Sequence, residues 1–501
     1  MTTENSPSSS AIRSAPMGRR EFMKTVSAAG LGLAMGTAPG LGQTPPASIA
    51  KRRRYAIVGT GARHEMYRDA IVRDYKDHAE LVALCDRNPG RVELSQQRAA
   101  EAGVQVPGYS AGDFEKMVRE TKPDIIIVTT VDGTHDDYIV WAMEAGCDVI
   151  TEKPMTTTAD KCQRILDARK RTRRRVRVTF NYRYSPPRTQ VKDLLMAGTI
   201  GDVLSVDFHW LLNTMHGTDY FRRWHSQKKN SGGLMIHKAT HHFDLVNWWL
   251  SAVPQTVTAV GKREFYTPAM AKRLGLQGPH ERCTTCPEKD KCGFLLDLAA
   301  NPSLKALYLD QEKHDGYFRD QCVFRKEIDI EDTMNVIVQY DTGTTLCYSV
   351  NAFNAWEGYH IAFNGTKGRL EHSIVEQIYV SGTGGMQGGI AAGGVSTRVI
   401  PMRGETRVIE PWTGTGGHGG GDKVMLDDIF LPAPPADKYL RASDERGGAG
   451  SMLIGAAANR CFLTGQPVRI ADLVIGWTRP DYPPMPTHKD PVPMPPRPAV
   501  G

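Results

Sequence analysis

Short apolar runs alternate with amphipathic stretches through the early part of the chain. Four of these runs, each five to seven residues long, lie at residues 54–58, 81–85, 124–130 and 147–151. Runs of this length between helical stretches indicate buried parallel strands joined by helices. The pattern therefore predicts an α/β domain with a doubly wound parallel sheet over residues 51–182.

The pattern changes after residue 183, where strands recur without regular helices between them. A linker helix at about 189–197 precedes predicted strands at 203–212, 256–260, 336–340, 345–350 and 360–364. Consecutive strands joined by turns favour an open, mainly antiparallel sheet, so residues 183–475 are predicted to form an α+β domain. A polar segment at 262–326 interrupts this sheet as an insertion, and a proline-rich tail covers residues 476–501.

A glycine turn follows the first apolar run, and an acidic residue ends the second. Gly59 permits a tight turn, and Gly61 lets a pyrophosphate approach the backbone at the start of the next helix. Asp86 can accept hydrogen bonds from the adenosine ribose hydroxyls, and its charge repels a 2′-phosphate. This unit predicts a Rossmann dinucleotide-binding domain that prefers NAD over NADP, although Arg87 weakens the preference and His64 replaces the third glycine of the motif.

Composition and charge exclude two classes of protein. With 40% hydrophobic and 23% charged residues, the chain is not expected to be disordered. Eight basic and two acidic residues lie within residues 1–54, whereas the other 447 residues carry 54 basic against 53 acidic ones. Because the folded body is thus nearly neutral, nucleic acid is not an expected partner.

The basic N-terminus predicts an export signal. Arg19 and Arg20 are followed by Phe22 and Lys24 and then by a weakly apolar, glycine- and alanine-rich stretch to about Leu41. This order is typical of a twin-arginine signal, so we expect the twin-arginine export machinery as a partner and a periplasmic or otherwise exported location. A disordered basic tail is the alternative. No other run of about 18 apolar residues occurs, so no stable membrane span is expected.

Two further motifs resemble those of the Gfo/Idh/MocA family of oxidoreductases, and the resemblance covers nearly everything after residue 51. One is Glu152-Lys153-Pro154, after the run at 147–151, and the other is the segment 178–186. The resemblance implies a nicotinamide cofactor and a homo-oligomer assembled through an exposed sheet face. It also implies that Lys153 lies beside the nicotinamide and the reacting carbinol, where an ammonium can polarise a developing alkoxide or carbonyl.

A cluster of histidines follows a glycine pair at residues 232–233. His237, His241 and Asp244 are spaced i, i+4 and i+7, which places them on one face of a helix. By the family resemblance, His241 matches the histidine that exchanges the substrate's hydroxyl proton, and Asp244 matches the acid beyond it. His237 stands where the family generally has aspartate, a departure from the usual acid–base pairing. Zinc bound by the histidines and a polar core helix are the alternatives.

Rings and charges are unusually dense between His209 and His225, a composition that suits the C–H patches and hydroxyls of a sugar. A glycine-rich loop around His418 is either a cover that closes over the site or an ordinary loop.

The predicted substrate contacts are Tyr182, Arg183, Trp224, Lys238, Asp244 and His418. The predicted catalytic residues are Lys153, His241 and His237. The predicted cofactor contacts are Gly59, Gly61, Ala62, Arg63, Asp86, Arg87, Thr130, His135, Glu152, Lys153 and Asn181.

Four cysteines gather in the insertion. Cys283 and Cys286 form a CxxC pair, Cys292 follows six residues later, and Cys322 is more distant. Four thiolates would form a closed, structural zinc site. Two disulfides, which exported proteins also form, and an iron–sulfur cluster are the rival interpretations. Folding in the reducing cytoplasm before export favours the metal.

Together these patterns predict an exported NAD(P)-dependent oxidoreductase that acts on a carbohydrate or carbohydrate derivative. Because the periplasm offers no obvious NAD(H) pool, the cofactor is expected to be carried in, held tightly and regenerated within each cycle. The alternative is a redox-neutral, NAD-dependent glycoside hydrolase or epimerase that works by transient oxidation. A third hypothesis is a non-catalytic sugar-binding protein on the same fold.

Overall fold

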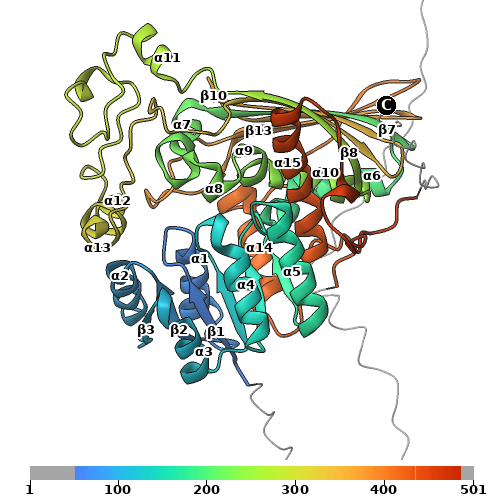
Figure 1. Cartoon of the computed structure of the whole chain (residues 1–501). Helices are drawn as coiled ribbons and strands as arrows, with labels where there is room; N and C mark the ends of the chain where they lie inside the picture. Colours follow the sequence, from blue (N-terminus) through green and yellow to red (C-terminus); the bar gives the residue numbers. More distant parts are fainter. Residues whose placement is uncertain (1–50, 435, 487–501) are drawn as a thin grey trace, which may run out of the picture. The chain divides into compact units, whose positions relative to one another are not determined.

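The structure, a computed structural model, describes residues 51–434 and 436–486. The twin-arginine signal predicted within residues 1–50 lies outside the described residues, as does the end of the chain after residue 486. The described part contains a parallel sheet with helices around it and a larger open sheet with helices against one face (Figure 1). No helix within these residues is long and apolar enough to cross a membrane.

The first sheet has seven strands in the order β15-β6-β5-β4-β1-β2-β3. The strands are β1 (Arg53–Val58), β2 (Ala79–Asp86), β3 (Gly108–Ser110), β4 (Ile125–Val128), β5 (Asp148–Thr151), β6 (Val176–Val178) and β15 (Ser443–Asp444). The first six are parallel, and β15 adds to β6 in the antiparallel sense. This arrangement confirms the predicted doubly wound sheet, whose central apolar strands are buried on both faces.

The helices of this domain alternate with its strands. They are α1 (His64–Asp69), the π-helical turn η1 (Ala70–Asp74), α2 (Pro89–Ala100), α3 (Phe114–Thr121), α4 (His135–Glu144) and α5 (Ala159–Thr172). The short 3₁₀ turns are η2 (Ala111–Asp113), η3 (Asp132–Thr134) and η4 (Asn181–Tyr184). The turns η3 and η4 follow strands β4 and β6, so they lie at the carboxyl edge of the sheet.

Side chains of β1 alternate between two hydrophobic clusters, one on each face of the sheet. Ala56 and Val58 belong to the larger cluster, and Tyr55 and Ile57 to the smaller one. Helix α14 (Gly421–Phe430), which comes from the far C-terminal part of the chain, also packs into the smaller cluster. Its contributing residues are Met425, Leu426, Ile429 and Phe430. The dinucleotide domain is therefore completed by residues far beyond the predicted boundary at 182.

The second sheet has nine strands in the order β14-β13-β12-β11-β7-β10-β9-β8-β16. They are β7 (Val203–Asn213), β8 (Pro254–Lys262), β9 (Thr333–Tyr340), β10 (Thr345–Asn354), β11 (Glu357–Gly365), β12 (Gly368–Glu376), β13 (Ile390–Pro401), β14 (Arg407–Val408) and β16 (Val468–Arg469). The strand pairs are antiparallel except β7–β10. The predicted open, mainly antiparallel sheet is thus confirmed.

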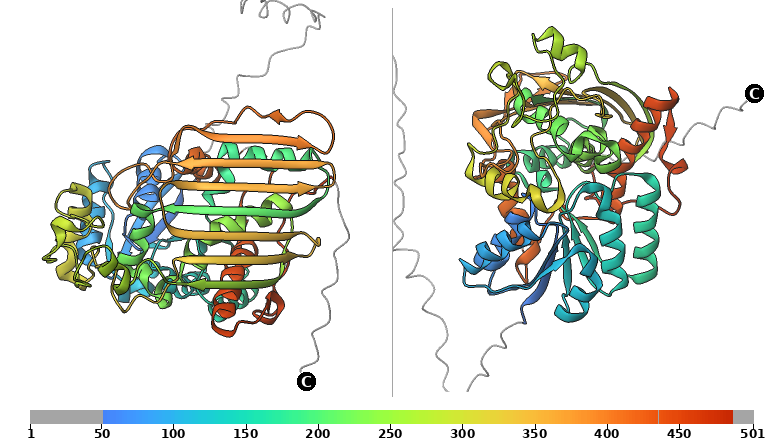
Figure 2. Two further views of the ribbon diagram at one scale, coloured as in Figure 1. Left: turned by 90° about the horizontal axis from the view of Figure 1, so that it is seen from above. Right: turned by 60° about the vertical axis from the view of Figure 1, so that its left-hand side comes forward.

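One face of this sheet is covered and the other is open. The helices of this domain are α6 (Pro186–Met196), α7 (Thr214–Arg222), α8 (Lys228–Ser231), α9 (Leu234–His237), α10 (Ala239–Leu250) and α15 (Glu445–Thr464), with the short turns η5 (Trp224–Ser226), η8 (Gly417–Gly420) and η9 (Ile470–Asp472). The left view of Figure 2, from above, shows the strands in front and the helices behind them. The alternation along β9 follows this geometry, since Val336 and Val338 are buried and Ile337 is 52% exposed.

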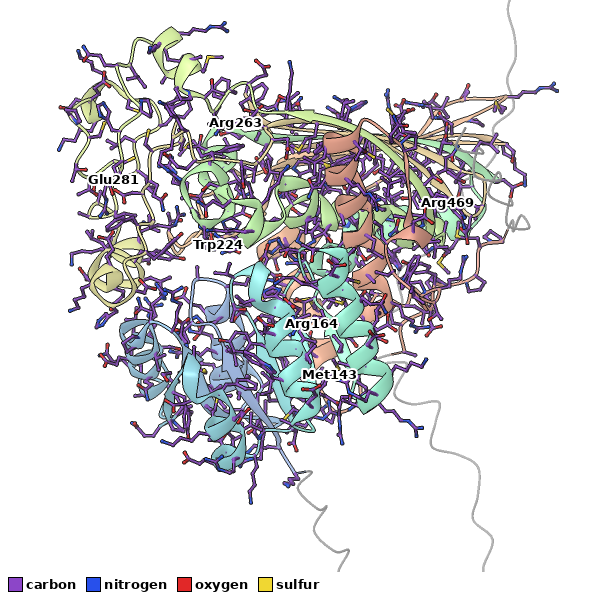
Figure 3. All side chains as sticks on the ribbon, viewed as in Figure 1. Met143, Arg164, Trp224, Arg263, Glu281 and Arg469 are labelled. Atoms are coloured by element: carbon purple, nitrogen blue, oxygen red, sulfur yellow. The ribbon has the colours of Figure 1, made fainter. Side chains whose placement is uncertain are left out.

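The insertion occupies residues 263–332, between β8 and β9, and so extends a little beyond the predicted 262–326. It contains α11 (Pro268–Arg273), η6 (Lys289–Lys291), α12 (Pro302–Leu307), η7 (Leu309–Gln311) and α13 (Glu312–Asp315). It leaves the sheet near Arg263, passes Glu281 and returns toward α2 of the first domain (Figures 1 and 3).

The predicted proline-rich tail is not separate from the fold at its start. The Trp477 indole N–H donates to the carbonyl of Arg446 (3.0 Å), and the Ser251 hydroxyl donates to the carbonyl of Pro483 (2.6 Å). Residues 476–486 therefore pack against the second domain instead of forming a free tail, because their aromatic and backbone groups find partners there.

Candidate active site

A cavity of about 630 Å³ lies where the carboxyl edge of the parallel sheet faces the helices of the second domain. Ligands of open α/β sheets bind at this edge. Every predicted catalytic and cofactor-binding residue lines the cavity. All the predicted substrate contacts line it as well, except Arg183 and Asp244. The chain thus brings together residues from positions as distant as Gly59 and His418.

The glycine turn after β1 has the geometry that the sequence predicts. Gly59 has φ +95°, and a Cβ there would lie 2.6 Å from the carbonyl group of Thr129, so no other residue fits. At Gly61 a Cβ would meet no atom within 4 Å, which leaves its backbone open to the cavity. The N–H of Thr60 donates to Asp86 Oδ2 (2.6 Å), so the acidic residue at the end of β2 also holds the turn.

His64 occupies the position of the missing third glycine, and its side chain links the glycine turn to α2. Its ring is buried, with Nδ1 2.5 Å from the Gly61 carbonyl oxygen and Nε2 2.7 Å from Ser95 Oγ. Burial and the nearby charge of Arg68 lower the pKa of His64 to about 3, so the ring is neutral. The departure from the glycine motif therefore keeps the turn in place through a side-chain contact.

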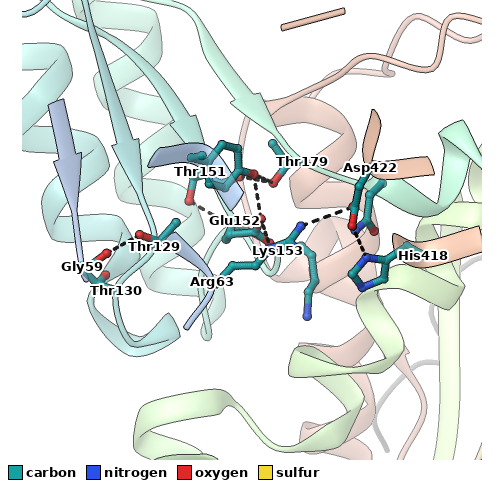
Figure 4. A network of polar contacts seen from close by, with 12 residues as sticks. Gly59, Arg63, Thr129, Thr130, Thr151, Glu152, Lys153, Thr179, His418 and Asp422 are labelled. Carbon is teal, nitrogen blue, oxygen red and sulfur yellow. Dashed lines mark hydrogen bonds and ion pairs between the residues drawn. The ribbon is translucent and has the colours of Figure 1, made fainter. Parts of the chain in front are cut away.

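Lys153 lies directly after β5 with its ammonium group between the two domains (Figure 4). Its Nζ donates to the carbonyl oxygen of His237 (3.3 Å). The neighbouring Glu152 accepts hydrogen bonds from Arg63 Nε (2.7 Å) and the Tyr67 hydroxyl (2.7 Å). Burial lowers the pKa of Lys153 to about 8, against the opposing influence of the Asp132 and Glu152 carboxylates.

His237 pairs with an acid that the sequence analysis did not identify. Its Nδ1 lies 2.5 Å from Oδ2 of Asp132, a buried residue in η3 at the end of β4. Burial raises the pKa of Asp132 and lowers that of His237, so the uncharged forms of both groups are favoured. The acidic side chain absent from position 237 is thus supplied by Asp132 of the other domain. An acidic residue two positions after the apolar run at 124–130 was the available signal.

The helix that carries these histidines is broken. Helix α9 ends at His237 and α10 begins at Ala239, whereas the sequence predicts a single helical face. The His241 N–H donates to the carbonyl of Lys238 (3.3 Å), which leaves the His237 carbonyl free to accept from Lys153. His237 and His241 still reach the same cavity.

Asp244 and Arg183 were both predicted to contact the substrate, but neither lines the cavity. The Arg183 guanidinium donates to both Asp244 oxygens, at 2.7 and 2.5 Å, and both side chains are about 1% exposed. Each side chain therefore finds its charge and hydrogen-bond partner in the other, outside the cavity. This buried pair joins η4 to α10, and it leaves neither group available to a sugar.

His241 packs flat against a neighbouring ring. Its centroid lies 4.5 Å from that of Tyr182, with an angle of 25° between the planes. Burial, together with the charges of Lys153 and Lys238, lowers the pKa of His241 well below its ordinary value. The imidazole is therefore neutral near pH 7. Its Nδ1 is buried without a hydrogen-bond partner among residues 51–434 and 436–486, which leaves Nε2 for a ligand.

The His418 loop contributes a second polar network (Figure 4). His418 Nδ1 lies 2.8 Å from Asp422 Oδ2, and the other carboxylate oxygen accepts from the Asn181 amide (2.8 Å). Arg63 lies 3.8 Å from the same carboxylate. Asp422, which the sequence analysis did not identify, thereby ties the loop to both the glycine-turn helix and η4.

The aromatic wall of the cavity comes from the second domain. Lys238 Nζ lies 4.6 Å from the centroid of the buried Trp210 ring, and Trp224 stacks on His225 at 3.5 Å. Trp224 lies at the junction of the two domains (Figure 3). Tyr379, Tyr308, Asp315 and Tyr317 also line the cavity, although nothing near them in the sequence marks them.

The structure does not show the predicted zinc site at the four insertion cysteines. Cys283, Cys286, Cys292 and Cys322 are free thiols, so neither of the rival disulfides is present either. Within the described ranges, no group of three or more histidine, cysteine or acidic side chains is arranged to hold a metal ion. Zinc bound by the clustered histidines is unsupported for the same reason.

The fold and the cavity define an NAD-binding oxidoreductase. The model of the oxidoreductase family's NAD-binding Rossmann fold matches residues 53–180, and the model of its C-terminal alpha/beta domain matches residues 192–470. The chain belongs to the Gfo/Idh/MocA family of oxidoreductases.

Individual relatives and a solved structure are similar to this chain to different extents. YteT of Bacillus subtilis is 36% identical over 416 residues, which cover 81% of this chain and 95% of YteT. An inositol 2-dehydrogenase of Salmonella paratyphi B is 27% identical over 186 residues, 37% of this chain and 51% of that protein. The aldose–aldose oxidoreductase of Caulobacter crescentus has the same fold, with a TM-score of 0.55 and 18% identity over 84% of this chain and 100% of its own.

Proposed function

We propose that this protein is an exported oxidoreductase that moves a hydride to or from a secondary alcohol carbon of a carbohydrate or carbohydrate derivative. It holds NAD tightly through turnover. The observation that carries the proposal is that Lys153 and His241, from separate domains, line one cavity together with the glycine turn. That combination offers a cation, a neutral base and a dinucleotide cleft at the same place.

The residues of the cavity fit a dinucleotide. Gly61 leaves its backbone open, and Asp86 stands where ribose hydroxyls are bound in this fold. Arg63, Thr130 and Asn181 line the same cavity as Asp86 and Lys153. The volume of about 630 Å³ lies within the range of cofactor sites. When bound, the nicotinamide supplies the hydride acceptor or donor.

The protein's own groups handle the proton. The neutral imidazole of His241 can accept the hydroxyl proton of a secondary alcohol at Nε2, because its Nδ1 is buried against the protein. The ammonium group of Lys153 can stabilise the negative charge that then develops on the substrate oxygen. The Asp132 side chain holds the His237 ring, and the His237 carbonyl accepts a hydrogen bond from Lys153 Nζ. The Asp132–His237 pair thereby positions the Lys153 ammonium group.

Carbohydrate is the substrate class that the second domain favours. Trp224 offers a ring face, and Lys238 and His418 offer polar groups in the same cavity. Two similar proteins point to the same class, since one is an inositol dehydrogenase and the other an aldose–aldose oxidoreductase by name.

Export, assembly and metal content belong to the proposal as well. Export by the twin-arginine route to the periplasm rests on residues 19–41 alone. A homo-oligomer rests on the open face of the nine-stranded sheet, where large apolar side chains such as Ile337 are exposed. Structural zinc rests on the spacing of the four insertion cysteines.

The Lys153 pKa predicts a pH dependence. The cationic form stabilises an alkoxide, so kcat/KM is expected to fall by about tenfold per pH unit above about pH 8. His241 is already neutral there and adds no change. The measurement is a pH profile of kcat/KM for the wild type and for Lys153→Arg, whose guanidinium stays charged. The residual activity of the variant should lack the descending limb, and a wild-type rate that rises through pH 8 contradicts this role.

Mass spectrometry of the purified protein under native and then denaturing conditions tests the function directly. We expect one NAD per chain, and the same spectra report zinc and the assembly mass. Assays with aldose pairs and with glycosides, without added NAD, then separate the two reactions. Oxidation of one sugar coupled to reduction of another supports the proposal, and glycoside cleavage without a net change in cofactor absorbance supports the redox-neutral alternative. A chain that neither contains nor binds NAD overturns both.

A further inference from the structure

The insertion forms part of the cofactor cavity. At the end of the cavity bounded by Asp86 and Arg87, here called the β2 end, the facing wall is made by Tyr308, Asp315, Gly316 and Tyr317. The Asn88 amide donates to the Gln311 carbonyl (3.0 Å) across this junction. Helices α12 and α13 accordingly lie beside α2 (Figure 1). The insertion thus reaches from the second domain to the ribose-binding edge of the first.

Close packing supports this contact. Leu298, Leu304, Leu307 and Tyr308 form a small buried cluster, and Ala62 of the glycine turn packs against it. A Cβ added at Gly90 in α2 would lie 1.9 Å from the Gln311 side chain and 2.8 Å from the His314 ring. Few side chains could enter such a junction. The insertion is therefore docked on α2 rather than lying free beside it.

Asp315 is the charged residue that the insertion brings to the β2 end. A single guanidinium nitrogen of Arg91 lies 2.5 Å from Asp315 Oδ2 and 3.6 Å from Asp86 Oδ1. The side chains of Arg91 and Asp315 are only 10% and 4% exposed. Burial acts to raise the pKa of Asp315, but hydrogen bonding to Asn88 and the charge of Arg91 outweigh it and lower the pKa, so Asp315 is ionised.

These contacts decide what Arg91 can bind. A guanidinium near the adenosine ribose is the usual partner of an NADP 2′-phosphate. In this chain the guanidinium of Arg91 is already engaged by two carboxylates. The four charges at this end, on Asp86, Asp315, Arg87 and Arg91, cancel, and without the Asp315 carboxylate their sum is positive. Asp315 thereby removes the attraction that Arg87 and Arg91 offer to a phosphate.

We propose that the insertion completes the adenosine end of the cofactor cleft and that Asp315 makes the cleft selective for NAD over NADP by engaging Arg91. The proposal rests on the dinucleotide-binding function proposed above. It adds a specificity residue that lies far from the glycine turn in the sequence, 224 positions after Arg91. Asp86 and Asp315 would then act together, one from each domain.

The test measures nucleotide selection without any turnover. The full-length protein is equilibrated with equal concentrations of NAD⁺ and NADP⁺ until the bound ratio is constant, then separated from free nucleotide and denatured, and both nucleotides are quantified. Asp315→Asn is expected to raise the bound NADP:NAD ratio by about tenfold or more, because a guanidinium freed for a phosphate gains a charged hydrogen bond. Asp315→Ala should shift the ratio in the same direction, and Asp315→Glu should keep the wild-type ratio.

Two controls separate selection from a general loosening of the insertion. Asp310→Asn removes an exposed acid of the same segment, one that pairs with Lys305, and should change nothing. In the double variant Asp315→Asn/Arg91→Ala the gain in NADP should disappear, since the gain requires the freed guanidinium. An unchanged ratio in a folded Asp315→Asn protein that still binds NAD, or a gain that persists without Arg91, overturns this proposal alone. A wild type that binds neither nucleotide overturns the proposed function too.

Discussion

Replacing Lys153 with methionine is expected to lower kcat/KM by about 10³-fold while the protein keeps its NAD. Methionine retains the length and the apolar stem of the side chain but removes the cation that faces the developing alkoxide. Losing one such stabilising donor typically costs about 10²- to 10³-fold, and here the donor is charged and partly buried. The measurement is steady-state kinetics on the sugar substrate, together with the nucleotide content after denaturation.

The matched control for this variant is Lys170→Met on the exposed side of α5, which should leave the kinetics unchanged. Lys153→Arg should retain part of the rate, because a cation remains although its geometry differs. If Lys153→Met keeps more than about a tenth of the wild-type rate, its ammonium is not the group that stabilises the alkoxide.

Replacing His241 with alanine is expected to lower kcat by about 10²- to 10⁴-fold, the range for losing a positioned general base. KM should change far less, because Tyr182 and Trp224 still supply the walls of the cavity. Added imidazole should restore part of the rate by entering the space left by the side chain. Rescue of this kind depends on proton transfer, and a histidine that serves only packing would not show it.

His242 provides the contrast on the same helix. It bonds to the Tyr348 hydroxyl (2.6 Å), stacks on Trp210 and is not among the residues that line the cavity. His242→Ala should lower the melting temperature and leave the kcat of the folded fraction close to wild type, with no response to imidazole. Equal losses of kcat in both variants would contradict the role assigned to His241.

Local patterns in the sequence predict the architecture well. The apolar run at 124–130 and the alternation along 336–340 each reflect the surroundings of one strand, buried on both faces in one case and on one face in the other. The glycine turn is equally local, since Gly59 has φ +95°, a backbone conformation that residues other than glycine rarely adopt. For the same reason the residues predicted at strand ends do line the cavity.

Contacts between distant segments escape such patterns. Asp132 meets His237 across 105 positions, and helical spacing alone says nothing of the break at Lys238 that frees the His237 carbonyl for Lys153. Asp244 has the expected spacing on the helix, but it forms a buried ion pair with Arg183 and does not line the cavity. These outcomes depend on how two domains pack together, which no short window of sequence contains.

Strand β15 and helix α14 carry a consequence for biosynthesis. The nucleotide-binding domain begins at residue 51, but its edge strand is formed by Ser443–Asp444 and part of its hydrophobic core by α14. A ribosome must therefore deliver almost the entire polypeptide before that domain can reach its final form. A fragment truncated near residue 182 would leave Tyr55 without the Phe430 ring, which packs edge-on against it at 5.1 Å.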